Sequence, residues 1–143
     1  MLMAIRFFKC TVCGHVVVKA VDSGMKLSCC GREMVELVPG ESEGSGEKHL
    51  PVFEWKDDDV LKVKVGSVAH PMDKTHWIMF ICLETERGFQ VVNLGPDMKA
   101  EAVFRICKKD RPVAVYAYCN IHGLWRTEVQ SDRKNCRFLI GCH

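Results

Sequence analysis

Four cysteines near the start of the chain restrict what its first segment can fold into. They occur as Cys10-x-x-Cys13 followed by a glycine, and as the adjacent pair Cys29 and Cys30. A segment of about 37 residues is too short to be held together by hydrophobic burial alone. Four thiolates form the tetrahedral ligand set of zinc or iron, and metal binding would supply the missing folding free energy. The sequence therefore predicts a metal-stabilised unit.

The spacing of the second cysteine pair is unusual. Cys29 and Cys30 are adjacent, without the usual two-residue gap, so we expect a distorted tetrahedron of sulfurs. Disulfide pairing is the alternative for these cysteines. It is disfavoured because disulfides persist in oxidising compartments, and nothing in the sequence marks the chain as secreted.

A second set of potential metal ligands is spread over the rest of the chain. It contains four histidines and one cysteine: His49, His70, His76, Cys119 and His122. Imidazole suits iron, zinc and copper, and one thiolate among imidazoles favours redox chemistry. A single histidine is more often a surface or hydrogen-bonded core residue. Five ligands of this mix instead predict one site, with a sixth coordination position open to a small ligand.

The sequence around these ligands predicts turns. Leu50 and His70 each precede a proline, which pushes the backbone towards extended or turn geometry. Cys119-x-x-His122 is followed by Gly123, and this short gap can direct two side chains onto one ion. We therefore expect the five side chains to converge.

Alternating apolar and polar residues predict β-strands, and no stretch has a convincing helical period. The run L-K-V-K-V at residues 61–65 has the period of two that marks a half-buried strand. Further strands are expected at residues 52–55, 77–83, 89–94, 102–107 and 113–118, with short ones at 5–9, 15–20 and 35–38. The expected class is all-β, with an antiparallel β-sandwich as the larger part.

Composition divides the chain into two folded parts and a tail. We expect a metal domain at residues 1–38, a polar glycine-rich linker at 39–46, a sandwich at 47–126 and an extra tail at 127–143. The tail contains Cys136, Cys142 and His143, which raise the idea of a third metal site. We favour a tail without one, because terminal segments are commonly disordered.

Charge and hydropathy argue against two classes of partner. A net charge of +2 does not suggest a nucleic-acid partner. The longest strongly apolar run, residues 77–83, is far shorter than the roughly 20 residues that span a bilayer, so no membrane partner is expected. Nine cysteines in a chain without an export signal predict a reducing cytoplasm.

The motifs together resemble the desulfoferrodoxin family of superoxide reductases. The resemblance runs from Cys10 to Trp125 and rests on the segments C-T-V-C-G, C-C-G, E-K-H-L-P-V, V-K-V-G-S-V-A-H-P-M, T-H-W and Y-C-N-I-H-G-L-W. It implies a desulforedoxin-like domain with iron bound by four cysteines. It also implies an immunoglobulin-like antiparallel β-sandwich with a neelaredoxin-like iron bound by four histidines and one cysteine.

The resemblance also implies a role for individual residues. Cys10, Cys13, Cys29 and Cys30 would hold the first iron, a set that zinc also accepts. His49, His70, His76, Cys119 and His122 would hold the second iron.

Two charged residues match the pair that the family places beside the open position of its second iron. Lys48 would steer an anion and organise a proton-donating water, although an ordinary exposed lysine is the alternative. Glu47 would close the open position between turnovers. Backbone amides near Asn120 and Ile121 are expected to moderate the Cys119 sulfur by hydrogen bonds.

The implied activity is the one-electron reduction of superoxide to hydrogen peroxide without production of dioxygen. A rubredoxin-like electron donor and a homodimer are expected with it. One alternative is a non-catalytic iron electron-transfer protein, which leaves an open position beside Lys48 unexplained. Another is a structural zinc protein, which leaves four histidines and a thiolate unexplained.

Overall fold

The chain divides into two compact units, Met1–Val38 and Pro39–His143. The computed structural model describes residues 4–40, 44 and 46–130. Outside these described residues lie 41–43 and 45 of the expected linker, and residues 131–143 with Cys136, Cys142 and His143, whose predicted roles stay predictions. Within the described part, no helix combines the length and apolar character needed to cross a membrane.

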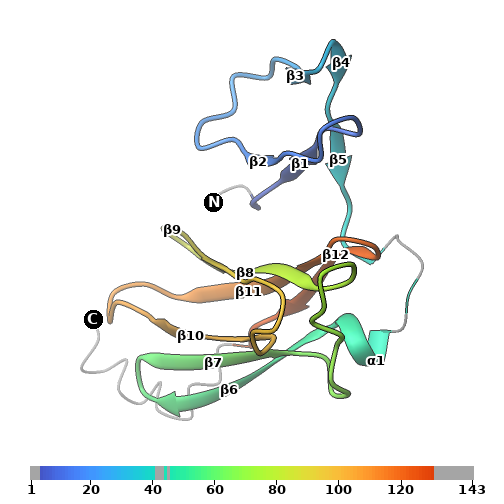
Figure 1. Cartoon of the computed structure of the whole chain (residues 1–143). Helices are drawn as coiled ribbons and strands as arrows, with labels where there is room; N and C mark the ends of the chain where they lie inside the picture. Colours follow the sequence, from blue (N-terminus) through green and yellow to red (C-terminus); the bar gives the residue numbers. More distant parts are fainter. Residues whose placement is uncertain (1–3, 41–43, 45, 131–143) are drawn as a thin grey trace. The chain divides into compact units, whose positions relative to one another are not determined.

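The first unit is built from short strands (Figure 1). Its three-stranded antiparallel sheet has the order β2-β1-β5, and β3 pairs with β4 in a separate hairpin. The strands are β1 Phe7–Lys9, β2 Val16–Val18, β3 Ser28–Cys29, β4 Arg32–Glu33 and β5 Val35–Leu37. The expected strands at 5–9, 15–20 and 35–38 coincide with β1, β2 and β5. No sequence pattern predicts β3 or β4, because two-residue strands carry no period.

The apolar core of the first unit is small. Its buried cluster consists of Phe8, Cys10 and Met34, with Val17 and Leu27 packed against it. One member of this cluster is a predicted metal ligand, so the apolar core and the cysteine cluster share side chains. A core of this size contributes little to the free energy of folding.

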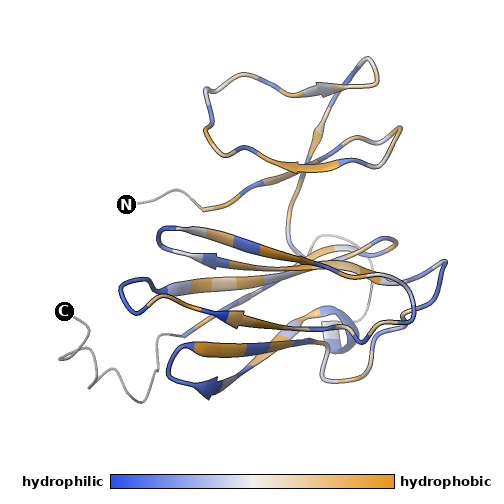
Figure 2. Ribbon diagram, turned by 60° about the vertical axis from the view of Figure 1, so that its left-hand side comes forward, coloured by the Kyte–Doolittle hydropathy of each residue, from blue (hydrophilic) through white to orange (hydrophobic). Residues whose placement is uncertain are grey.

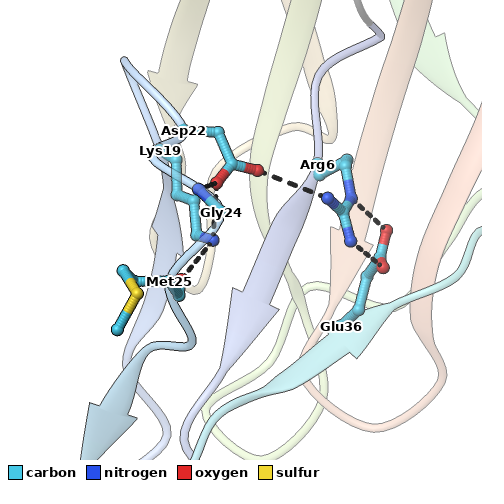
Figure 3. Close-up of polar contacts among 6 residues, drawn as sticks. All are labelled: Arg6, Lys19, Asp22, Gly24, Met25 and Glu36. Carbon is cyan, nitrogen blue, oxygen red and sulfur yellow. Dashed lines mark hydrogen bonds and ion pairs between the residues drawn. The ribbon is translucent and has the colours of Figure 1, made fainter.

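A polar cluster holds the long loop after β2 against the sheet (Figure 3). The Arg6 guanidinium donates to both carboxylate oxygens of Glu36 on β5, at 2.8 and 3.0 Å, and reaches Asp22 at 3.4 Å. Asp22 also accepts from the Lys19 ammonium at 3.0 Å and from the Gly24 N–H at 2.8 Å. The Gly24 N–H is the main reason that the pKa of Asp22 lies below its usual value, and Arg6 lowers the pKa of Glu36.

The second unit is a two-sheet sandwich (Figure 1). One antiparallel sheet has the order β10-β7-β6 and the other β12-β11-β8-β9. The first sheet contains β6 Pro51–Asp57, β7 Val60–Val65 and β10 Glu101–Arg105. The second contains β8 Ile78–Thr85, β9 Gly88–Asn93, β11 Pro112–Cys119 and β12 Gly123–Glu128. The predicted all-β class and antiparallel sandwich are confirmed.

The core of the sandwich lies between these two sheets. On β7, Leu61, Val63 and Val65 are buried while the lysines between them are not, as the alternating pattern predicts. They pack with Ile81 of β8 and Phe104 of β10 in one cluster. Figure 2 shows hydrophobic colour along the strands and hydrophilic colour at the hairpin ends. This core is much larger than that of the first unit.

The last strand differs from the sequence prediction. β12 pairs with β11 and continues to Glu128, so the expected end of the sandwich at residue 126 falls inside a strand. The Thr127 hydroxyl donates to the Pro51 carbonyl at 2.6 Å, and Val129 is 4% exposed in the core. Residues 127–129 therefore belong to the sandwich and not to the tail.

Candidate metal centres

The four cysteines of the first unit converge. Cys10 and Cys13 lie in the turn between β1 and β2, and Cys29 and Cys30 lie in the β3–β4 hairpin. The turn is closed by the Cys10 N–H, which donates to the His15 carbonyl at 2.9 Å. All four sulfurs lie within 4.8 Å of one another.

The sulfur separations fit a tetrahedral ion. Cys13 and Cys29 sulfurs are 3.6 Å apart, and those of Cys29 and Cys30 are 3.9 Å apart. Sulfurs at about 2.3 Å from one metal are about 3.8 Å from each other. The adjacent pair is accompanied by an unusual backbone conformation, because Cys30 has φ 53°, which is uncommon for a residue with a side chain. The distorted tetrahedron of sulfurs stays a prediction.

The protonation of these thiols also favours a bound cation. N–H groups of Cys13 and Val12 lower the pKa of Cys10 to about 6, which favours a thiolate. Hydrogen bonds with the Cys13 and Cys10 sulfurs raise the pKa of Cys29 to about 12. Without a cation, four crowded thiols cannot all ionise, so the arrangement fits a metal.

His15 lies beside this cluster without joining it. Its Nδ1 is 4.0 Å from the Cys29 sulfur, and the residue is exposed. The group of mutually close ligand atoms contains four sulfurs and not this imidazole. His15 therefore lies outside the candidate ligand set.

The second ligand set also converges, at one end of the sandwich. The ligand atoms of its five members, His49, His70, His76, Cys119 and His122, lie within 4.8 Å of one another. They come from α1 Gly46–His49, from the loop between β7 and β8, and from the end of β11 with the turn that follows it. Figure 1 shows α1 and both connections at the same end of the strands.

The four imidazoles form a square, in chain order around its edge. Neighbouring ring centroids are 4.6 Å apart for His49 and His70, 4.7 Å for His70 and His76, 5.0 Å for His76 and His122, and 4.7 Å for His122 and His49. The rings of His49 and His76 are 6.5 Å apart, longer than any side, as a diagonal must be. Neighbouring rings are steeply inclined to each other, so each can present one nitrogen to the centre.

Cys119 completes the group. Its sulfur is buried and lies 3.8 Å from Nδ1 of His122, and it accepts the His122 N–H at 3.3 Å. The expected donors were amides near Asn120 and Ile121. The N–H that reaches the sulfur belongs to the residue after Ile121, whereas the Asn120 N–H donates to the Trp77 carbonyl at 3.2 Å. The tight Cys119-x-x-His122 turn therefore supplies both ligands and the N–H that moderates the thiolate.

His70 is held in the state that binds a metal, and His76 has a buried nitrogen available to one. His70 Nδ1 bonds the Pro71 carbonyl at 2.6 Å, so its Nε2 is free of the ring proton and faces His49 Nε2 at 3.1 Å. Burial lowers the pKa of His70 to about 4, which keeps the ring neutral. Nε2 of His76 is buried and has no hydrogen-bond partner among the described residues. A metal ion at the centre would satisfy these nitrogens, so the site fits iron.

Two other side chains hold the ligand histidines in place. Trp125 stacks on His49 with ring centroids 5.1 Å apart, and its indole N–H donates to the His122 carbonyl at 3.0 Å. Asp73 accepts the His76 N–H at 2.9 Å and the Thr75 hydroxyl at 2.9 Å, which folds the turn that presents His76. The D-x-x-H spacing is a recognisable side-chain-capped turn, a signal that the sequence analysis missed.

A glycine turn after β7 fixes the short helix α1. Gly66 N–H donates to the Leu50 carbonyl at 2.9 Å, and Val68 N–H and the Ser67 hydroxyl both donate to the Glu47 carbonyl at 3.2 Å. Gly66 has φ +80°, and a Cβ there would lie 2.6 Å from the Lys48 carbonyl oxygen. Only glycine allows this approach.

The charged pair of α1 lies at the surface. Glu47 and Lys48 directly precede His49, and both are exposed. The Glu47 carboxylate is not part of the close group of ligand atoms. Both residues therefore directly precede a member of the histidine square and are in contact with solvent.

Comparison with known proteins agrees with this picture. Residues 4–37 match the family "Desulfoferrodoxin, N-terminal domain", and residues 41–128 match the family "Desulfoferrodoxin". The desulfoferrodoxin of Nitratidesulfovibrio vulgaris is 42% identical over 121 residues, covering 85% of this chain and 94% of that protein. A desulfoferrodoxin homolog of Archaeoglobus fulgidus is 39% identical over 128 residues, covering 89% and 99%.

A solved structure supports the same assignment. The crystal structure of the superoxide reductase from Treponema pallidum has a TM-score of 0.73 and 32% sequence identity, and the match covers 87% of this chain and 98% of that chain. The two ligand groups are consistent with two iron sites. With sequence relatives, a solved neighbour and both ligand groups in agreement, the chain belongs to the desulfoferrodoxin family.

Proposed function

We propose that this chain is a superoxide reductase, which converts superoxide to hydrogen peroxide without producing dioxygen. The observation that carries the proposal is the square of four imidazoles with one buried cysteine sulfur. Five ligands of this kind leave a coordination position for a small molecule. Relatives of this chain from Pyrococcus abyssi and Pyrococcus horikoshii are themselves named superoxide reductase.

The charge of the site suits the substrate. Four neutral imidazoles and one thiolate carry a single negative charge, so a divalent ion among them keeps a net positive charge. Superoxide is a small anion, and a positive site at the surface attracts it. Ferrous iron bound by these residues would supply the one electron that superoxide takes up.

Lys48 and Glu47 divide the remaining tasks in this proposal. Superoxide that gains one electron needs two protons to leave as hydrogen peroxide. The exposed Lys48 ammonium attracts the anion and holds a water that donates protons. Glu47, one residue earlier on α1, covers the open position in this proposal when no substrate is bound.

The ligand assignments are part of the proposal. His49, His70, His76, Cys119 and His122 hold the active-site iron, and their closeness and the buried free nitrogen of His76 support this. The His122 N–H on the Cys119 sulfur withdraws some of the electron density that the thiolate donates.

The first unit has a supporting role in the proposed function. Cys10, Cys13, Cys29 and Cys30 hold a second iron, and the exposure of Cys13 and Cys30 would allow electrons to enter there. A rubredoxin-like protein is proposed as the donor, a homodimer as the assembly and the cytoplasm as the location. The donor and the dimer follow from the family resemblance, and the cysteine content supports the cytoplasm.

The test is the addition of superoxide to oxygen-free, iron-loaded protein in steps. We expect thiolate-to-ferric absorption to appear in proportion to the superoxide added, with hydrogen peroxide formed and no dioxygen. A chain that contains iron and shows reversible redox but reacts sluggishly with superoxide would instead be an electron-transfer protein. Production of dioxygen would overturn the proposal, because it would indicate dismutation.

A further inference from the structure

The side chain of Asn120 joins the segment around His76 to the turn between Cys119 and His122, and these two segments carry three of the five ligands. Its Oδ1 accepts the Trp77 N–H at 3.0 Å, and its Nδ2 donates to the Thr75 carbonyl at 3.0 Å. Its own main-chain N–H donates to the Trp77 carbonyl at 3.2 Å. One residue thus makes three hydrogen bonds to a segment 43 to 45 positions away in the chain.

These bonds surround the ligand His76. Thr75 and Trp77 are its two chain neighbours, and both are bonded to the same amide group. Asn120 itself lies between the ligands Cys119 and His122. Fixing the peptides on both sides of His76 against this turn therefore sets where the His76 ring stands relative to the sulfur and to the His122 ring.

We propose that Asn120 is a positioning residue of the histidine site, which clamps the His76 segment to the Cys119-x-x-His122 turn. The inference concerns the same site as the proposed function, and it rests on that site binding a metal. Asn120 acts on the ligands through peptide groups and is not itself a ligand.

The clamp requires an amide side chain. It must accept from the Trp77 N–H and donate to the Thr75 carbonyl at the same time, and a carboxylate of the same shape has no proton to donate. Alanine would lose both side-chain bonds. An aspartate would keep the bond from Trp77 and place a negative oxygen against the Thr75 carbonyl.

The clamp also has a consequence for the thiolate. Because the Asn120 N–H is bound to the Trp77 carbonyl, it is not directed at the Cys119 sulfur, which receives the His122 N–H instead. Each N–H that reaches a metal-bound thiolate draws electron density away from the metal. Asn120 thus limits the hydrogen bonding of the sulfur and keeps it a strong donor.

The test uses the full chain with Asn120→Ala, Asn120→Asp and, as a matched control, Asn93→Ala. Asn93 is exposed at the end of β9, far in sequence from the ligand loops. Three quantities are measured: amide exchange of Trp77 in the metal-free chain, Zn²⁺ affinity at the histidine site, and the energy of the thiolate-to-ferric absorption band after iron loading.

We expect Asn120→Ala to speed Trp77 exchange by about fivefold to tenfold, as loss of one hydrogen bond does. It should weaken Zn²⁺ binding by about tenfold or more, the usual effect of removing a group that orients ligands. The absorption band should shift. Asn120→Asp should retain most of the Trp77 protection and still lose metal affinity, while Asn93→Ala should change none of the three.

Unchanged Trp77 exchange and unchanged Zn²⁺ affinity in a folded Asn120→Ala chain would overturn the proposal. If the Asn120→Ala chain does not fold, the Asn120→Asp chain provides the test. Wild-type Zn²⁺ affinity in Asn120→Asp would overturn the proposal, because it would show that the hydrogen bond to the Thr75 carbonyl does not position the ligands. The exchange and Zn²⁺ measurements involve no superoxide, so their outcome is separate from that of the proposed function.

Discussion

The two units use metal ligands in opposite ways. In the first unit a ligand, Cys10, is one of the three buried side chains of the small core, and the strands have two or three residues. In the second unit the ligands lie at one end of a sandwich. Of these ligands Cys119 alone belongs to the buried core cluster, and its other members, such as Leu61, Val63 and Phe104, bind no ion. In the first case the ion would create the fold, and in the second the fold creates the ion's site. The difference explains why a closed site and an open site can exist in one chain.

The largest expected effect comes from removing a ligand of the first unit. Cys10→Ala should leave residues 4–38 unfolded, because the free energy of a structural tetrathiolate site, about 10–16 kcal/mol, is also the folding free energy of such a unit. The sandwich should keep its protected amides. Hydrogen exchange on the full chain measures both units at once.

The matched control is a ligand of the second unit. His76→Ala should abolish metal binding at the histidine square and leave both units folded. Protected amides in the first unit of the Cys10→Ala chain would contradict the comparison, and so would unfolding of the sandwich in the His76→Ala chain.

A glycine substitution tests whether the sandwich positions its ligands. Gly66→Ala should destabilise the second unit by roughly 1–3 kcal/mol, because φ +80° is strained for alanine and the new Cβ meets the Val68 and Lys48 carbonyls. The metal content of the histidine site should fall, because Gly66 holds α1 and therefore His49. Thermal unfolding and metal analysis measure the two effects.

Gly88 in the β8–β9 hairpin provides the control for that substitution. A Cβ there meets nothing within 4 Å. Gly88→Ala should therefore keep the full metal content of the histidine site. A Gly66→Ala chain with normal stability and normal metal content would show that α1 is not fixed by this turn.

The rate of reaction with superoxide at the open histidine site should depend on nearby charge. The closed tetrathiolate site should show no such dependence. Lys48→Ala should slow the reaction with superoxide by about tenfold at low ionic strength, and less at high salt, because steering of an anion is screened by ions. Stopped-flow or pulse-radiolysis rates at several salt concentrations measure this.

Lys26→Ala removes the same charge from the first unit, where Lys26 is 84% exposed and paired with Glu33. The Lys26→Ala chain should react with superoxide at the same rate as the parent chain at every salt concentration. An unchanged rate constant and an unchanged salt dependence in Lys48→Ala would remove Lys48 from the proposed mechanism.

The smallest expected effect concerns the polar cluster of the first unit. Arg6 lowers the pKa of Glu36 below its usual value of 4.5, so the folded state favours the ionised carboxylate. This stabilisation is present above the unfolded pKa and is lost as the pH falls through the folded pKa. Glu36→Gln should therefore lower the stability of the first unit slightly at neutral pH and not in acid.

The difference between the parent and Glu36→Gln unfolding curves, recorded in metal-loaded protein at several pH values, measures this contribution. Glu33→Gln breaks a more exposed pair and should have a smaller effect at neutral pH. A difference that grows in acid would contradict the assignment of the stabilisation to ionised Glu36.

The sequence predicted those parts of the molecule that have a local pattern. The alternation at Leu61, Val63 and Val65 predicted a strand with its buried face, and the cysteine and histidine spacings predicted the two groups of residues that the structure brings together. Both rest on residue type and short spacing, which are visible in one sequence.

Features that depend on long-range contacts were not predictable in this way. The helix α1 has four residues and is held by carbonyl contacts to the turn at Gly66, and β12 is defined by its pairing with β11. The same reason applies to Asn120, since an asparagine after a cysteine is unremarkable until Trp77 is known to lie opposite it. That the individual ligands hold iron stays a proposal.

The pairing of β8 with β11 has a consequence for how the chain acquires its metals. Cys119 lies opposite Ile78 in this pairing, so Cys119 and His122 reach His76 only after strands far apart in sequence have joined. Contacts between residues far apart in sequence form slowly, because loop closure loses chain entropy before the new contacts stabilise the structure. The four cysteines, by contrast, are enclosed within one short segment. A newly made chain can therefore load its tetrathiolate site early, whereas the histidine site, with its open coordination position, accepts its ion only once the sandwich has closed.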